Sequence, residues 1–177
     1  MSESDPQEEV VETPETYNKV IKLLKDNNVA YEEMVHRPAK TSAEAAEIRN
    51  SPLESGAKAI LVKGKKGIWL LVMSASKQID WKLVKKVVGR VEFVPLEEVP
   101  TITGCLSGAV PPFGSVLGES PIPTFMDVSL QEQGDIIYFN CGLRTHTLKM
   151  KCDDYIKIEK PTITSFTKCT VCVNQTD

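Results

Sequence analysis

The chain has 177 residues, of which 41% are hydrophobic and 25% are charged, with a formal net charge of −3. This length is sufficient for one sizeable core and short for two, so a single globular domain is expected. The chain has no long apolar run that would span a membrane, and its first fifteen residues carry six acids and no base, which fits neither a secretory signal nor a mitochondrial transit peptide. A cytosolic protein with no membrane partner is expected, and the five cysteines, an odd number, fit reduced thiols.

Two helices and a short strand are predicted in the first fifty residues. Thr13 is placed to cap a helix whose first residue is Pro14, and an apolar stripe follows at helical spacing. The segment AYEEMVH, residues 30–36, predicts a short strand. A second helix is predicted in TSAEAAEIRN because Thr41 and Glu44 have the spacing of a capping box.

A basic hairpin and a third helix are predicted next. The apolar runs AKAILVKG and GIWLLVMS are separated only by Lys65 and Lys66, which predicts two paired strands with a basic tip. Asp80 has the position of an N-cap for the amphipathic helix WKLVKKVV, and Gly89 is placed to end that helix.

The second half of the chain reads mainly as strands. RVEFV, IPTFMDV, DIIYFN and LRTHTLKM each predict a strand, and a short helix is expected from Cys152 to Ile156. The lack of regular βα alternation predicts an α+β fold, a single domain with a central mixed, mostly antiparallel sheet, open or barrel-like, flanked by helices. The expected divisions are a disordered acidic N-terminus at 1–12, the domain at 13–160 and a C-terminal tail at 161–177.

Charge is strongly segregated along the chain. Residues 56–90 contain nine lysines and arginines against the single acid Asp80, a local charge of +8, whereas residues 91–177 carry eleven acids against six bases. Binding of a polyanion depends on local rather than net charge, so this basic segment is a candidate polyanion-binding face. The alternative, a solvated face of a helix and a hairpin, stays open.

The stretch TGCLSGAVPPFG, residues 103–114, is rich in glycine and proline and holds no charged side chain and no imidazole. Any chemistry at this loop must therefore come mainly from backbone groups held in a fixed shape. Gly108, Ala109 and Val110 can each offer an N–H, while Pro111 and Pro112 restrict the backbone that follows. Such N–H groups are the usual donors of an oxyanion hole.

The order of several motifs resembles the YbaK and prolyl-tRNA synthetase-associated editing domain family. VHRPAKTSAEAAE, GAKAILVKG, ASKQIDWKLVKKVVG, GAVPPFG and FNCGLRTHTLKM follow one another as they do in that family, over roughly residues 17–158. The resemblance implies a YbaK-like fold and hydrolysis of a mischarged aminoacyl-tRNA, usually alanyl- or cysteinyl-tRNA(Pro). It also implies tRNA as the partner, with a synthetase as a further candidate, and water rather than a protein group as the nucleophile.

The resemblance, together with the loop, assigns candidate roles to individual residues. The catalytic candidates are Lys58, Gly108, Ala109, Val110 and Pro112. The substrate-binding candidates are His36, Ser107, Pro111, Phe113, Gly114 and His146. The tRNA-binding candidates are Lys63, Lys65, Lys66, Lys82, Lys85 and Lys86. No metal and no cofactor are expected.

Alternatives remain for several of these residues. His146 is either a pocket residue or a structural histidine, and Lys58 is either a substrate contact or an edge lysine reaching solvent. The chain could also be a tRNA-binding appendage without turnover, or a hydrolase with Cys105 or Cys141 as nucleophile and His146 as base. The CTVC pair near the C-terminus, Cys169 and Cys172, cannot by itself form a zinc site, so incidental thiols are expected there.

Overall fold

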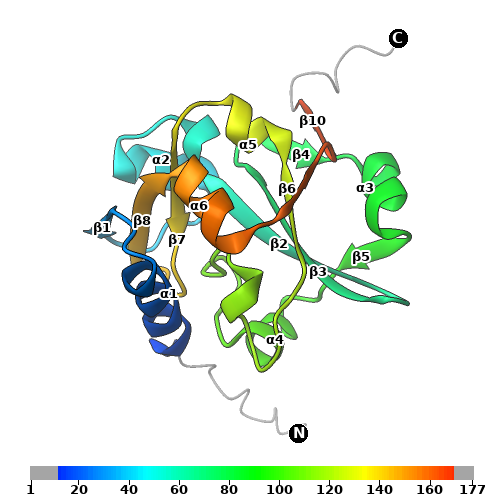
Figure 1. Ribbon diagram of the computed structural model, residues 1–177, viewed down its shortest axis with the longest axis horizontal. Helices are drawn as coiled ribbons and strands as arrows, with labels where there is room; N and C mark the ends of the chain where they lie inside the picture. The colour runs from blue at the N-terminus through cyan, green and yellow to red at the C-terminus, as the bar shows by residue number, and fades with distance from the viewer. Residues whose placement is uncertain (1–11, 170–177) are drawn as a thin grey trace, which may run out of the picture.

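The computed structural model describes residues 12–169 and folds them into helices and short strands arranged around a long β-hairpin (Figure 1). The helices are α1 (Glu15–Asp26), α2 (Ser42–Arg49), α3 (Trp81–Val88), α4 (Val99–Thr103), α5 (Val128–Glu132) and α6 (Cys152–Glu159), with 3-10 turns η1 (Leu53–Ser55) and η2 (Gly114–Val116). The strands are β1 (Tyr31–Val35), β2 (Ala57–Gly64), β3 (Gly67–Ser74), β4 (Lys77–Ile79), β5 (Val91–Phe93), β6 (Thr124–Asp127), β7 (Ile136–Asn140), β8 (His146–Lys151), β9 (Thr162–Thr164) and β10 (Thr167–Cys169).

The described strands form three open sheets. The largest has the order β5-β2-β3-β6-β9, with antiparallel pairs from β5 to β3 and parallel pairs from β3 to β9. A second sheet, β1-β8-β7, is wholly antiparallel, and β10 pairs with β4. The predicted α+β class with a mixed sheet is confirmed, whereas the barrel-like form is wrong because the strands do not close on themselves.

The starts of the helices have the predicted capping side chains in two cases out of three. The Thr41 hydroxyl accepts the Glu44 N–H at 3.1 Å, and the Asp80 carboxylate accepts two N–H groups at the start of α3. In contrast, α1 begins after Pro14 and has no side-chain cap, so the predicted cap at Thr13 is wrong. Gly89 ends α3 with a φ of 87°, a conformation that glycine adopts at little cost.

The β2–β3 hairpin is paired along its full length. Its register runs from Ala57 opposite Ser74 to Gly64 opposite Gly67, and Lys65 and Lys66 form the exposed tip. Both faces of the hairpin are covered, which explains why its strands are continuously apolar instead of alternating. One face meets the β1-β8-β7 side and the other meets α3, at the right of Figure 1.

The C-terminal part of the described chain belongs to the fold. Asp127, which is almost fully buried, accepts N–H groups from Phe166 at 2.7 Å and Thr167 at 3.1 Å, and so holds β10 beside the end of β6. The expected tail at 161–177 therefore begins too early, because residues 162–169 form paired strands. Residues 1–11 of the expected acidic N-terminus, and residues 170–177, lie outside the described range.

No helix in residues 12–169 is long and apolar enough to cross a membrane.

Candidate active site

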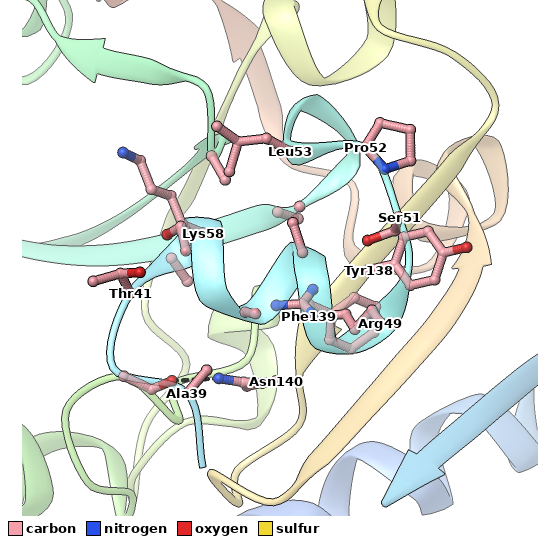
Figure 2. Close-up of a pocket in the computed structure, with 18 of the residues that line it drawn as sticks. Ala39, Thr41, Arg49, Ser51, Pro52, Leu53, Lys58, Tyr138, Phe139 and Asn140 are labelled. Carbon is pink, nitrogen blue, oxygen red and sulfur yellow. Dashed lines mark hydrogen bonds between the residues drawn. The ribbon is translucent and has the colours of Figure 1, made fainter. Parts of the chain in front are cut away.

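A cavity of about 210 Å³ opens between α2, the start of β2, the loop at residues 108–110 and the end of β7 (Figure 2). The elements that form it are distant in sequence, and they meet where the start of β2 lies beside β7, with a bridge between Gly56 and Tyr138. Its lining residues are Ala39, Lys40, Thr41, Ser42, Ala45, Ala46, Arg49, Ser51, Pro52, Leu53, Gly56, Ala57, Lys58, Ala59, Ala75, Gly108, Val110, Tyr138, Phe139 and Asn140.

The lining is cationic in a protein of negative net charge. It includes Lys40, Arg49 and Lys58, and no Asp or Glu. Burial lowers the pKa of the Lys58 ammonium and of the Arg49 guanidinium, because removal from water penalises the charged form. A cavity with this lining favours an anionic ligand.

The Lys58 ammonium is turned toward the neighbouring strand. It donates a hydrogen bond of 2.7 Å to the main-chain oxygen of Lys77, and in Figure 2 it points away from Asn140. Lys58 therefore lines the cavity with its stem and ties β2 to the start of β4. To contact a ligand in the cavity, its ammonium must leave the Lys77 oxygen.

The loop at residues 107–110 presents backbone donors to the cavity. Gly108 has a φ of 85°, and nothing lies within 4 Å of the position that a Cβ would occupy there. The Ala109 N–H is engaged in the loop itself, donating to the Leu106 oxygen at 3.0 Å, so the expectation that Ala109 supplies a free donor is wrong. Gly108 and Val110 line the cavity, and their N–H groups make no backbone hydrogen bond within residues 12–169.

Two side chains anchor this loop from the following strand and turn. Asn140 Nδ2 donates to the Gly108 oxygen at 2.6 Å, and the Arg144 guanidinium donates to the Ser107 oxygen at 2.9 Å and 3.2 Å. Sequence analysis did not select Asn140 or Arg144, although both lie in the motif FNCGLRTHTLKM. These two polar side chains could not be paired with the glycine-rich loop until the sheet order was known.

His36 reaches the loop indirectly. Its Nδ1 lies 2.7 Å from the Arg37 main-chain oxygen, which can only accept, so Nδ1 carries the proton. Its Nε2 lies 2.7 Å from the Thr147 hydroxyl, which is itself 3.4 Å from Asn140 Oδ1. His36 is not among the residues that line the cavity, and its position supports a role in orienting Thr147 and Asn140.

His146 and Ser107 lie outside the cavity. The His146 ring packs edge-on against Tyr17 of α1, with a centroid separation of 5.3 Å, and its Nδ1 contacts the Thr145 hydroxyl. Of the two roles that the sequence allowed for His146, a pocket residue or a structural histidine, these contacts favour the structural one. Ser107 faces a second, mostly apolar hollow of about 450 Å³ beside Phe93 and Leu96, which shares Gly108 and Val110 with the cavity.

The second half of the loop is part of the core. Phe113 is fully buried between Phe139 and Tyr155, and the Tyr155 hydroxyl donates to the Pro112 oxygen at 2.7 Å. The Gly114 N–H donates to the Thr124 hydroxyl. The expected substrate contacts are corrected for three residues, because burial keeps them from the cavity: Pro111, Phe113 and Gly114. Pro112, which was expected among the catalytic residues, is buried as well and does not line the cavity.

Three of the candidate tRNA-binding lysines lie at or near the tip of the β2–β3 hairpin, the end farther from the cavity. Lys65 and Lys66 are exposed at the tip, whereas Lys63 forms an ion pair with Glu98 at 2.9 Å, which offsets its charge. The remaining three are exposed on α3: Lys82, Lys85 and Lys86.

The thiol mechanism is not compatible with the positions of the cysteines. Cys105 and Cys141 are both buried and neither lines the cavity. Burial raises the pKa of Cys105 and raises that of Cys141 to about 12, which opposes formation of a thiolate. Cys141 Sγ contacts the main-chain oxygen of His146 instead of its ring. No cluster of metal-ligating side chains occurs within residues 12–169, and Cys172 lies outside that range.

This fold and cavity define a class of protein. A family model described as the aminoacyl-tRNA editing domain matches residues 36–158, so the chain belongs to that family. The predicted family is confirmed, and with it the expected class of enzyme, a hydrolase of aminoacyl-tRNA esters.

Particular relatives agree with this assignment. The chain is 29% identical over 157 residues to the multifunctional Ser/Thr-tRNA deacylase ProXp-y of Escherichia coli (strain K12), covering 85% of this chain and 92% of the relative. A crystal structure titled as a candidate trans-editing enzyme for prolyl tRNA synthetase superposes with a TM-score of 0.74 at 21% identity, covering 88% of this chain and 98% of that one. A hypothetical protein superposes with a TM-score of 0.77 at 21% identity, covering 85% and 99%. These two structures confirm the fold.

Proposed function

We propose that this chain hydrolyses the ester between a small amino acid and the 3′ end of a mischarged tRNA, with the cavity beside Gly108 as its active site. The observation that carries the proposal is the cavity itself, in which unengaged backbone donors and a cationic wall meet in an editing-domain fold. A second site that hydrolyses wrong products is a general remedy where a synthetase cannot separate small amino acids by binding alone.

Water is the proposed nucleophile. The residues that line the cavity include no histidine, cysteine or carboxylate, and within residues 12–169 no hydrogen bond links a lysine to the hydroxyl of Thr41, Ser42 or Ser51, so no nucleophile is paired with a base there. The N–H groups of Gly108 and Val110 are the candidate donors to the oxyanion that forms when water attacks the ester carbonyl. Arg144 holds the Ser107 carbonyl, which belongs to the same peptide group as the Gly108 N–H, and Asn140 holds the next carbonyl, that of Gly108, so the loop is fixed before substrate binds.

The size of the cavity favours a small amino acid. A volume of about 210 Å³ corresponds to roughly seven water molecules, which leaves room for a short side chain beside the ester and the attacking water. The expected substrates are alanyl- or cysteinyl-tRNA(Pro). Seryl- and threonyl-tRNA are added to these expected substrates for two reasons. The Escherichia coli relative is named a Ser/Thr-tRNA deacylase, and the cavity lining includes the hydroxyl groups of Thr41, Ser42 and Ser51.

The test is a deacylation assay with purified protein over alanyl-, cysteinyl-, seryl-, threonyl- and phenylalanyl-tRNA. Hydrolysis of at least one small aminoacyl-tRNA is expected, with the phenylalanyl ester hydrolysed more slowly because its ring would take up the room that the ester and the attacking water need in a cavity of about 210 Å³. Tight tRNA binding without hydrolysis of any ester would instead establish the non-catalytic appendage. A cytosolic location and association with a synthetase belong to the same proposal, and co-purification with prolyl-tRNA synthetase would test the latter.

A further inference from the structure

One cation of the cavity wall has no partner in the described part of the chain. Arg49 is the last residue of α2, and its Nε is buried without a hydrogen bond. The guanidinium groups of Arg37 and Arg144 are engaged, with Glu44 and with the Ser107 oxygen respectively. Arg49 therefore differs from both in being partly withdrawn from water with nothing to compensate it.

Arg49 is half-buried, and its Nε, being buried without a hydrogen bond, is costly, since a polar group of a charged side chain that leaves water needs a partner. Burial lowers the pKa of Arg49, yet an arginine remains charged at neutral pH. The cavity lining offers no carboxylate to pair with it. An anionic group of the ligand is therefore the partner that fits Arg49 in this cavity.

The substrate of the proposed function has one kind of anion close to its ester. The amino group of the esterified amino acid is cationic or neutral, and the carboxyl group is consumed in the ester, so the nearest negative charge is the phosphodiester between the last two nucleotides. A guanidinium matches a phosphate with two parallel hydrogen bonds. The Lys58 ammonium, the other buried cation, is engaged with the Lys77 oxygen.

We propose that Arg49 binds the phosphodiester that joins the last two nucleotides of the tRNA, and so positions the ester beside Gly108. This inference rests on the proposed function. It makes Arg49 a substrate-binding residue that recognises a nucleotide phosphate and not the amino acid.

The test compares two dinucleotides by isothermal titration calorimetry, cytidylyl-(3′→5′)-adenosine and its methylphosphonate analogue, whose linkage is uncharged. The wild-type chain should bind the charged dinucleotide about tenfold more tightly or better, as for a hydrogen bond between charged groups. Arg49→Met keeps an apolar stem without the charge and should abolish this preference. Arg90→Met is the matched control, because it removes an exposed guanidinium outside the cavity and should keep the preference.

Equal binding of the two dinucleotides by the wild type would overturn the inference, as would a preference that persists in Arg49→Met. If Arg49→Met does not fold, Arg49→Lys is measured in its place. An undiminished preference for the charged dinucleotide in Arg49→Lys would also contradict the inference, because a lysine lacks the planar guanidinium that donates two parallel hydrogen bonds to a phosphate. The measurement needs no hydrolysis. If the preference for the charged dinucleotide depends on Arg49 but the protein hydrolyses no aminoacyl-tRNA, only the proposed function is refuted. If the protein hydrolyses an aminoacyl-tRNA but shows no such preference, only the role of Arg49 is refuted.

Discussion

Replacement of Gly108 by alanine tests whether the loop backbone is the catalyst. The φ of 85° at Gly108 is unfavourable for any residue with a Cβ, by about 1–2 kcal/mol, although the Cβ itself would meet open space. The substitution therefore acts through the backbone and should turn the adjacent N–H groups away from the ester carbonyl. Loss of one oxyanion donor costs about 10²- to 10³-fold in rate, and a fall of that order is expected in single-turnover deacylation.

Gly89 supplies a matched control for this prediction. Its φ is 87°, a Cβ there would also meet open space, and it ends α3 outside the cavity. Gly89 also has a ψ of −164°, in a region that only glycine commonly adopts, so Gly89→Ala should lower the melting temperature by at least as much, about 2–12 °C, and leave the rate nearly unchanged. Ser107→Ala should be mild as well, because the Ser107 group that holds Arg144 is its main-chain oxygen. Equal rates in Gly108→Ala and Gly89→Ala, or a larger loss in Ser107→Ala, would refute the backbone mechanism.

Three further predictions concern the side chains around the loop and the basic end of the hairpin. Lys58→Ala should greatly reduce single-turnover deacylation while lowering the free energy of unfolding in urea by only about 1.5–3 kcal/mol, the typical worth of a hydrogen bond with a charged donor such as its bond to the Lys77 oxygen; full activity would contradict its assignment. Asn140→Leu should slow deacylation about tenfold with tRNA affinity retained, because the Gly108 carbonyl, which lies between the two candidate N–H donors, loses its anchor; an unchanged rate would show that the loop keeps its shape without Asn140. Binding of tRNA should weaken log-linearly with salt, and charge reversal at Lys82, Lys85 and Lys86 should flatten the slope by about 0.9 for each phosphate that the protein no longer neutralises. An unchanged slope would place the tRNA on another face.

The sequence was most informative about features that depend on a single residue and its near neighbours, such as helix caps and turns. The caps at Thr41 and Asp80, the stop at Gly89 and the two-lysine tip of the hairpin were all predictable, because each depends on neighbours within a few positions. The loop at residues 103–114 was also correctly selected as an unusual backbone. Its chemistry was predicted less well, since the internal bond from Ala109 to Leu106 depends on the path that the chain takes through the loop.

The features that were not predicted depend on contacts between residues that are distant in sequence. Asn140 and Arg144 reach the loop from 32 and 37 residues away, and nothing in their local sequence marks them as its anchors. The strand β10 was expected to be a tail because so short a segment carries no strong pattern, but Asp127 supplies the hydrogen bonds that hold it. Arg49 was overlooked for a similar reason: on a short helix it reads as an ordinary basic residue near the helix end.

The separation between the cavity and the basic tip constrains what the proposed substrate must look like. Lys58 and Lys65 are seven residues apart along an extended hairpin, which corresponds to about 23 Å. A free amino acid or a single nucleotide cannot span that length, whereas a tRNA can place its 3′ end in the cavity and its stem phosphates beside the tip. Substitutions at the two ends should then separate in kinetics. Loss of charge at the tip should raise KM through weaker tRNA binding, while changes at Gly108 should lower kcat, because only the cavity contacts the ester.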